Sequence, residues 1–408
     1  PISLGALAGT KRQRAFMPVR RSPLHDWATA RGALFVEAGL WMRIRAFPQD
    51  GETLFDAAMR ETARTRSHVG VTDVSTLGKI DIQGPDAAEL LNRVYVNGWK
   101  RLPVGRARYG LMLREDGIVL DDGTTSRLGE THYHMTTTTA QAGPVMSHLE
   151  FCLQALWPDL DVQVQSVTDQ WAGLAIAGPN ARTLVQRLLP EVDLSNDAFP
   201  FMGVGQYARD GVTVRVFRIT FSGELGFEIN VPADYGPAFA DLLLELGADL
   251  GVTLYGLEAL DVMRIEKGHV TGAELDGRVT AQDLGMGRML SSKKDFVGRM
   301  LSQRPGLADP ERPRMIGLKP VDGTSRLRAG AHLLPVGAEA TIAHDQGHVS
   351  SATYSPTFGH WIALGFLTRG EERHGETVRA VDLLRDLDVE CEVVSPHFYD
   401  PEGEIQRG

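Results

Sequence analysis

The sequence contains very little cysteine. Its 408 residues include only Cys152 and Cys391, which lie far apart and form no CxxC pair. This scarcity argues against a disulfide scaffold and against a zinc site built from cysteine ligands. It is typical of proteins from a reducing compartment, so we expect a cytoplasmic protein.

Long apolar segments and an excess of positive charge are also absent. No apolar run approaches the roughly 20 residues that a transmembrane helix requires. The net charge of −10 at pH 7 disfavours binding to the phosphate backbone of a nucleic acid. We therefore predict neither a membrane nor a nucleic acid partner.

Several common signatures of active sites are missing as well. No GxxxxGK[ST] and no GxSxG occurs, which argues against a P-loop NTPase and an α/β-hydrolase. The segment GVGQYA (203–208) fits G-x-G-x-x-A, but a strand pattern follows it where a dinucleotide site needs a helix. The twelve histidines are scattered; His132 and His134 could share a strand face, but no carboxylate stands at ligand spacing beside them. We predict no metal site.

The length of the chain predicts two or three domains. Residues 1–24 have neither an initiator methionine nor the apolar core of a signal peptide, so we interpret them as a linker from a missing upstream region. The segment SQRPGLADPERPR (302–314) is rich in proline and charge and indicates a second linker.

Two segments repeat one pattern. GKIDIQGPDAAELLNRV (78–94) and AGLAIAGPNARTLVQRL (172–188) each contain a strand, a Gly-Pro pair and an amphipathic helix, and the two Gly-Pro pairs lie 94 residues apart. Proline fits the first helical turn, where its missing N–H costs nothing. We predict two related α+β units within residues 25–300.

Beyond the linker, short strand-like runs divided by glycines predict a small β-barrel over residues 313–398. The expected fold class is therefore α+β with a C-terminal β-barrel.

Three carboxylates stand in strand-like segments. Asp121 and Asp122 follow the apolar run 118–120, and Glu228 lies within FEINV (227–231). Successive strand residues point to opposite faces, so one aspartate of the pair would face inward. A buried carboxylate needs a partner, because an unpaired buried charge is costly. The pattern alone leaves open that these carboxylates face solvent or cap a turn.

In their order and spacing, several stretches resemble the aminomethyltransferase (glycine-cleavage T-protein) family of tetrahydrofolate-dependent enzymes. They are DVSTLGKIDIQGPDAAELLNRV, DGIVLDD, FSGELGFEINVP, GLEALDVMRIEKG and SPTFGHWIALGF. The similarity covers about residues 25–400 and implies that residues 25–300 form a folate-binding domain. STLGKIDIQGPDAAELLNR, MTTTT, LSNDAFPFM and GLEALDVMRIEKGH are further similar to the C-terminal half of the α subunits of heterotetrameric sarcosine oxidases.

The resemblance implies transfer of the oxidised N-methyl group of sarcosine to tetrahydrofolate, which yields glycine and 5,10-methylenetetrahydrofolate. Tetrahydrofolate is then the cofactor of this chain, while FAD, FMN and NAD belong to the missing region or to partner subunits. The implied partners are the other sarcosine oxidase subunits of a hetero-oligomer and a small-molecule one-carbon donor. Whether sarcosine or dimethylglycine is the parent substrate stays open.

The functional residues of the family map onto individual positions. The key aspartate falls on Asp121, which would stabilise a cationic iminium and take a proton, with Asp122 on the solvent side. The pterin-binding glutamate falls on Glu228, whose carboxylate would accept two parallel donors. The other implied cofactor-binding residues are Phe221, Leu77, Tyr109 and Thr138.

Two positions depart from the family pattern. Leu260 stands where an arginine helps to bind folate, and Tyr399 is the nearest counterpart of a C-terminal tyrosine. One alternative is a folate-binding accessory protein of the iron–sulfur repair type, but KGHVTGAE (267–274) has His269 in place of the cysteine of that group. Another is a structural domain without transfer activity.

Overall fold

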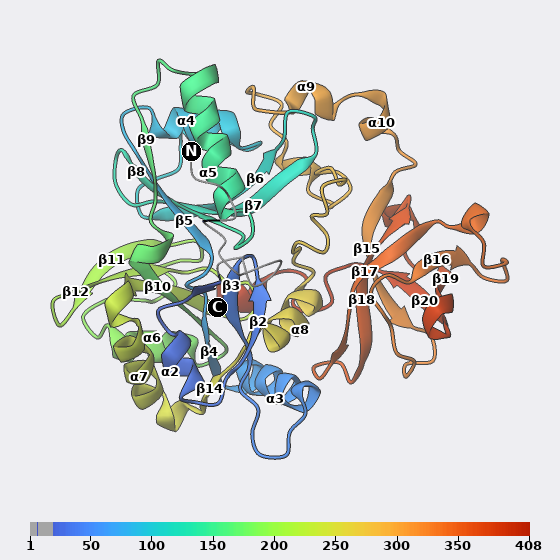
Figure 1. The fold of residues 1–408 in the computed structure, drawn as a ribbon, viewed down its shortest axis with the longest axis horizontal. Coiled ribbons are helices and arrows are strands. Elements are labelled where there is room, and N and C mark those ends of the chain that lie inside the picture. Colours follow the sequence, from blue (N-terminus) through green and yellow to red (C-terminus); the bar gives the residue numbers. More distant parts are fainter. Residues whose placement is uncertain (1–5, 7–18) are drawn as a thin grey trace.

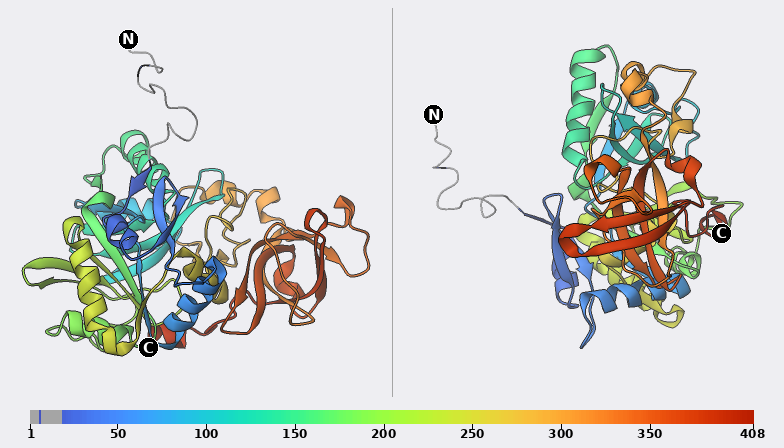
Figure 2. Two further views of the ribbon diagram at one scale, coloured as in Figure 1. Left: turned by 60° about the horizontal axis from the view of Figure 1, so that its bottom comes forward. Right: turned by 90° about the vertical axis from the view of Figure 1, so that its right-hand side faces the viewer.

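The structure, a computed structural model, describes residue 6 and residues 19–408, so most of the predicted linker 1–24 lies outside the described residues. The described chain forms three lobes, two built on sheets and one on a barrel (Figure 1). In a second view the barrel stands to one side of the two sheet lobes (Figure 2). Among the helices of the described residues, none is long and apolar enough to cross a membrane.

One lobe holds a five-stranded sheet in the order β6-β7-β8-β5-β9. Its elements are β5 (Gly78–Gln83), α4 (Ala87–Val94), β6 (Arg106–Leu113), β7 (Val119–Arg127), β8 (His132–Thr137), α5 (Ala142–Phe151) and β9 (Gln163–Ser166). Ile80 and Ile82 pack with Leu90 of α4 and Leu149 of α5 in one buried cluster. The two helices therefore cover one face of this sheet, which we call its outer face (Figure 1).

The second lobe holds a six-stranded sheet in the order β11-β12-β13-β10-β4-β14. Its elements are β4 (Val69–Asp73), β10 (Trp171–Ala177), α6 (Ala181–Leu188), β11 (Val204–Arg209), β12 (Val212–Phe217), β13 (Gly226–Pro232), α7 (Gly236–Leu246) and β14 (Val252–Leu254). Val71 and Ile176 pack with Leu184 of α6 and Leu243 of α7. The helix-covered side is again the outer face.

The N-terminal elements form a small sheet in the order β1-β3-β2. They are β1 (Arg20–Arg21), α2 (His25–Thr29), β2 (Leu34–Ala38) and β3 (Trp41–Ala46), followed by α3 (Leu54–Ser67). Thr53 and Asp56 form a capping box at the start of α3, which satisfies backbone N–H groups that the helix leaves unpaired. Helix α8 (Leu257–Lys267) lies beside α3 (Figure 1).

The two related units exchange their first strands. The segments β4–β5 and β9–β10 occupy equivalent places in the repeat, 94 residues apart. However, β4 pairs with β10 of the second unit, and β9 pairs with β5 of the first unit, both antiparallel. The two sheets are thus joined by two crossing connections, β4 to β5 and β9 to β10.

The Gly-Pro pairs follow the central strands β5 and β10. Gly84 has φ +138° and Gly178 has φ +125°. A Cβ at Gly84 would lie 2.3 Å from the carbonyl oxygen of Asp161, and one at Gly178 would lie 2.5 Å from that of Thr65. Only glycine fits both requirements. The prolines precede the N-cap residues Asp86 and Asn180, so they stand just before the helices. The prediction that they occupy the first helical turn is wrong.

The C-terminal lobe is a closed barrel in the order β15-β18-β17-β16-β19-β20. Its strands are β15 (Pro313–Pro320), β16 (His332–Pro335), β17 (Gly347–Ser355), β18 (His360–Thr368), β19 (Thr377–Asp382) and β20 (Leu387–Val394). The short helices α9 (Arg299–Ser302) and α10 (Pro305–Ala308) precede it, and α11 (Glu404–Arg407) follows it. The predicted fold class is confirmed. The domain limits 25–300 and 313–398 stay predictions.

Charged side chains of α8 attach the barrel to the rest of the molecule. Arg264 donates to Ser351 Oγ of β17 at 2.6 Å and pairs with Glu274 at 2.8 Å. Glu266 accepts a hydrogen bond from Ser355 Oγ at the end of β17 at 2.5 Å. Because these groups are buried and paired, α8 and the barrel are fixed relative to each other.

Candidate active site between the two sheets

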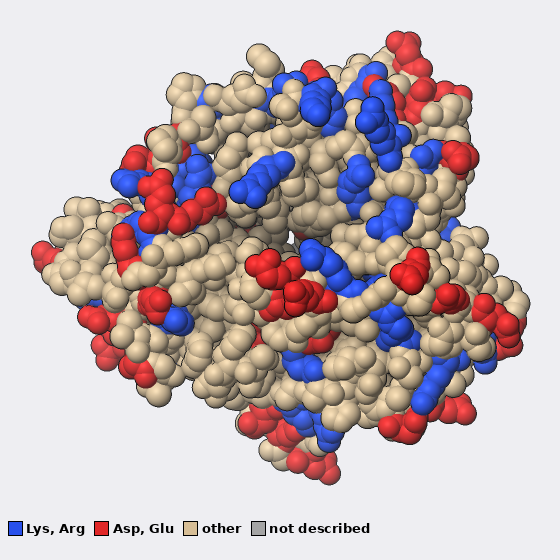
Figure 3. Space-filling model, turned by 180° about the vertical axis from the view of Figure 1, so that it is seen from behind, with Lys and Arg blue, Asp and Glu red and all other residues tan. Residues whose placement is uncertain are grey.

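The two sheets turn polar faces toward each other. Arg215 of β12 crosses between them, 3.2 Å from His134 Nδ1 of β8 and 3.6 Å from Asp81 of β5. The ring of Phe217 stacks on His134 at a centroid distance of 5.7 Å. We call the faces that carry these residues the inner faces. On the back of the molecule the surface is hollowed near its centre, where the lobes meet (Figure 3).

Glu228 lies on the inner face of the six-stranded sheet. It stands opposite Phe217 of β12 and Ala175 of β10 in the strand register. It is half-buried, and no described residue donates a hydrogen bond to its carboxylate. Burial raises the pKa of Glu228 to about 7, while the positive charge of Lys79 acts in the opposite direction. The carboxylate is therefore available to a ligand that brings hydrogen-bond donors.

The expected orientation of the acidic pair is correct only in part: Asp121 is buried, as expected of the inward carboxylate, whereas the expectation for Asp122 is wrong. Asp121 stands opposite Met112, which packs in the cluster under α4 and α5, so Asp121 is on the outer face. It is 2% exposed, and it accepts hydrogen bonds from Thr138 N at 3.2 Å and Thr138 Oγ1 at 2.9 Å. Burial, and then the neighbouring charge of Asp122, raise the pKa of Asp121 to about 7.

Asp122 faces the other way and is not a solvent-side residue. It shares the inner face with Thr124 and with Tyr109, whose Oη donates to Asp122 Oδ2 at 2.7 Å. Burial raises the pKa of Asp122 to about 6, and the Tyr109 hydrogen bond opposes that rise. The catalytic role implied for Asp121 stays a prediction.

The remaining predicted residues fall in different parts of the site. Tyr109 contacts Asp122, whereas Thr138 contacts Asp121 on the outer face. Leu77 is half-buried in the connection from β4 to β5. Phe221 lies in the connection from β12 to β13, is 37% exposed and packs its ring 5.4 Å from that of His269.

The two departures from the family pattern have clear local roles. Leu260 packs on a buried cluster of Tyr255, Ala259 and Met263, so it contributes an apolar contact in place of a charge. Tyr399 donates through its hydroxyl to Glu224 at 2.6 Å, in the same loop as Phe221. Tyr399 thus supports the loop that carries Phe221.

Sequence reasoning missed two further features of the inner faces. Lys79 of β5 is 2% exposed and lies near Glu228. Asp81 holds both His132, at 3.0 Å, and His134, at 2.6 Å. The signal that could have revealed Lys79 is its place between Gly78 and Ile80, since a charged residue is unusual in a strand that is otherwise apolar there. Asp81, the partner of the two histidines, lies some 50 residues upstream of them in the sequence. Motif spacing rules cover only short separations, so they could not predict this contact.

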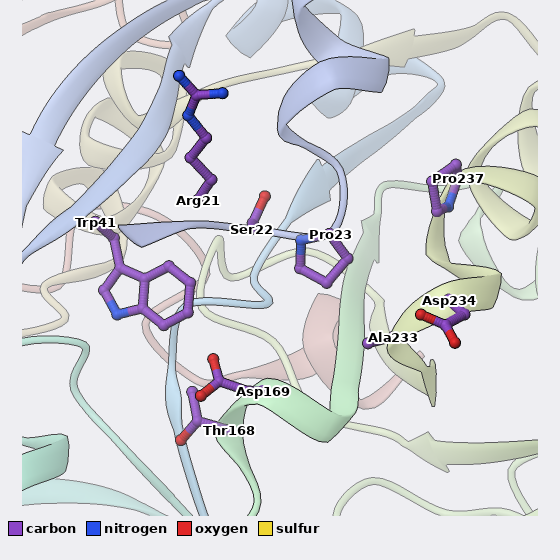
Figure 4. Close-up of a pocket in the computed structure, with 9 residues that line it drawn as sticks. All are labelled: Arg21, Ser22, Pro23, Trp41, Thr168, Asp169, Ala233, Asp234 and Pro237. Carbon is purple, nitrogen blue, oxygen red and sulfur yellow. The ribbon is translucent and has the colours of Figure 1, made fainter. Parts of the chain in front are cut away.

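A hollow of about 410 Å³ lies beside the small N-terminal sheet. Trp41, Thr168 and Asp234 line it together with Arg21 and other residues (Figure 4). None of the predicted site residues lines this hollow. No cluster of three or more potential metal ligands occurs among the residues that the structure describes.

Comparisons with known proteins agree with this architecture. The profile of the GCVT N-terminal domain matches residues 24–294, and that of the glycine cleavage T-protein C-terminal barrel domain matches residues 314–400. The chain belongs to the glycine cleavage T-protein, or aminomethyltransferase, family. Its sequence is 32% identical over 387 residues to an aminomethyltransferase of Saccharopolyspora erythraea, which covers 93% of this chain and 98% of that protein.

Sarcosine oxidase subunits are more similar in sequence. The chain is 52% identical over 408 residues to sarcosine oxidase subunit alpha of Rhizobium meliloti, which covers 99% of this chain but 41% of that protein. It therefore spans about two fifths of the length of such relatives. The crystal structure of glycine cleavage system aminomethyltransferase T from Bartonella henselae superimposes with a TM-score of 0.80, at 25% identity, over 94% of this chain and 99% of that one. The resemblance noted in the sequence is confirmed.

Proposed function

We propose that the inner faces of the two sheets bind a reduced folate and that this chain transfers a one-carbon unit to it. Membership of the aminomethyltransferase family supports the reaction class. The observation that carries the proposal is the Glu228 carboxylate, half-buried on an inner face without a hydrogen-bond donor among the described residues. A half-buried acceptor of this kind is open to the donors of a ligand.

The residues present fit a reduced folate. The 2-amino and N3–H groups of its pterin ring are two parallel donors, which match the two oxygens of Glu228. Phe221 and Leu77 supply apolar surface for the ring from two connecting loops. When bound, tetrahydrofolate supplies the amine nitrogens that take up the one-carbon unit.

Asp122 is the proposed proton acceptor. Its Oδ2 is held by Tyr109, and no side chain of a described residue donates a hydrogen bond to its Oδ1, which can take a proton from an attacking amine. With its pKa raised to about 6, the carboxylate is mainly ionised at neutral pH yet more basic than an exposed aspartate. Its negative charge also stabilises a cation formed beside it. Asp121 supports this strand through Thr138.

The wider context follows from the sarcosine oxidase relatives. We propose that the chain is part of a longer α subunit in a hetero-oligomeric sarcosine oxidase, with the FAD, FMN and NAD sites outside these residues. The one-carbon unit then comes from the oxidised N-methyl group of sarcosine, and glycine and 5,10-methylenetetrahydrofolate are the products. Reducing cytoplasm is the proposed location. An accessory or structural domain would instead show no transfer.

Replacing Glu228 with glutamine should weaken tetrahydrofolate binding. The amide turns one acceptor into a donor that opposes the pterin N–H. Loss of a charge-assisted hydrogen bond costs about 1.5–3 kcal/mol, or about ten- to a hundredfold in Kd. Anaerobic titration calorimetry on the chain measures the Kd.

The affinity for tetrahydrofolate should also depend on pH. Protonated Glu228 accepts only one of the two donors, so the wild-type affinity should fall as the pH drops through about 7. The glutamine variant should lose this dependence.

Glu258 provides a matched control, because it is also a half-buried glutamate but pairs with Arg45 away from the inner faces. Glu258→Gln should bind tetrahydrofolate like the wild type. An unchanged Kd in folded Glu228→Gln would contradict the proposed site. Failure of the wild-type chain to bind any reduced folate would favour the structural alternative.

A further inference from the structure

Lys79 is a buried lysine with spare hydrogen-bonding capacity. It lies on the inner face of the five-stranded sheet and is 2% exposed. Its Nζ donates to the carbonyl oxygens of Ser75 at 2.9 Å and Leu77 at 3.2 Å. An ammonium group has three N–H donors. The third N–H therefore has no hydrogen-bond partner among the residues that the structure describes.

The charges around Lys79 come from both sheets and from the nearby loops. Burial lowers the pKa of Lys79 to about 8, and the groups that oppose this are Glu228 first, then Asp73 and Asp169, while Arg43 adds to the lowering. Lys79 is in turn the charge that opposes the raised pKa of Glu228. No hydrogen bond joins the two side chains, so both Glu228 oxygens and one Lys79 N–H remain available to a ligand.

Together the two side chains present two acceptors and one donor. The edge of a pterin ring carries the complementary series, namely the 2-amino donor, the N3–H donor and the 4-oxo acceptor. We propose that Lys79 is a specificity-determining residue that donates its third N–H to the 4-oxo group of a pterin held by Glu228. This inference rests on the proposed function, which it extends to the part of the ring that distinguishes 4-oxo from 4-amino pteridines.

The position of Lys79 in the fold supports this role. Its two occupied N–H groups hold the backbone of the connection from β4 to β5, in which Leu77 lies. The same side chain therefore orders an apolar contact and supplies a polar one. A lysine with only the structural task would affect all ligands of the site equally.

The test compares tetrahydrofolate with 4-amino-4-deoxytetrahydrofolate, which has an amino group in place of the 4-oxo acceptor and no hydrogen on N3. Loss of the N3–H donor affects its affinity for every variant alike, so the change in selectivity between variants reports on position 4. The Kd of each is measured anaerobically by calorimetry for the wild-type chain and for Lys79→Met. The ratio of the two values within one protein cancels any loss of folded material. Lys294→Met is the matched control, because Lys294 also donates to two backbone carbonyls, those of Asn92 and Tyr95, and burial lowers its pKa to about 8 as well.

The expected result is a selectivity for tetrahydrofolate that falls by about ten- to a hundredfold in Lys79→Met. The 4-amino compound has no acceptor at position 4, so its affinity should change much less. Lys294→Met should keep the wild-type selectivity. Equal weakening of both ligands, or no weakening, would overturn the inference while leaving the proposed function intact. Absence of folate binding to the wild-type chain would overturn both.

Discussion

Asp122→Asn should slow one-carbon transfer by roughly 10²–10⁴-fold, the usual effect of a lost general base. The amide keeps the size of the side chain and still accepts the hydrogen bond from Tyr109. It carries no charge to stabilise a cation, and it cannot take the proton of the amine. Tetrahydrofolate affinity should stay close to that of the wild type, because the pterin ring is held at Glu228.

The measurement is product partitioning in the full-length protein assembled with its partner subunits. Sarcosine oxidation at the flavin should continue, while formaldehyde replaces 5,10-methylenetetrahydrofolate at saturating folate. Asp121→Asn is the matched comparison, since Asp121 is bound to Thr138 on the outer face. It should change partitioning little. If Asp121→Asn were the damaging variant, the role implied by the resemblance would hold and the assignment to Asp122 would be wrong.

Arg66→Met should destabilise the fold by about 3–5 kcal/mol, because it leaves buried carboxylates unpaired. Arg66 lies 2.8 Å from Glu224 and 2.5 Å from Glu266, and all three side chains are almost fully buried. Its guanidinium also stacks over the ring of Tyr399 at 3.8 Å. The network joins α3, α8 and the loop of Phe221, so its loss affects two lobes at once.

Denaturant unfolding of the purified chain measures this change. Arg278→Met provides the control, because Arg278 pairs with Asp276 at the surface and its side chain is 78% exposed. That variant should lose no more than about 1 kcal/mol. Adding Glu266→Gln to Arg66→Met should recover part of the loss by removing one unpaired charge. An unfolding midpoint for Arg66→Met equal to the wild-type value would contradict the importance of the network.

The acidic pair shows how a local feature can exchange the two faces of a strand. Counting by two from buried Val119 places Asp121 on the same face as Val119. In the structure the register shifts between Met112 and Leu113, so that Val119 opposes Leu113 but Asp121 opposes Met112. This β-bulge at Leu120 moves Asp121 to the outer face and leaves the inner face to Asp122. Nothing in the local sequence marks the extra residue.

Some of the site could be predicted from single residues. A glutamate between Phe227 and Ile229 is conspicuous in an apolar strand, and the structure places it on an inner face. The same signal was present for Lys79 between Gly78 and Ile80, but a lysine in a strand is usually attributed to a solvated face. The carboxylate that most strongly favours its charged form is Glu228, which lies in another sheet and is far away in the sequence.

The sequence by itself determined the class of fold, the repeated strand–Gly-Pro–helix unit and the β-rich C-terminal lobe. These features depend on local properties, because periodicity, glycine conformation and proline placement act within a few residues. Only the tertiary structure decided that β4 and β9 are exchanged between the sheets and that Lys79 faces Glu228. Alternating apolar residues show that a strand has a buried face, but they do not identify its neighbour. Strand pairing is chosen by the packing of the whole molecule, and so the composition of the inner faces emerges only when both sheets are assembled.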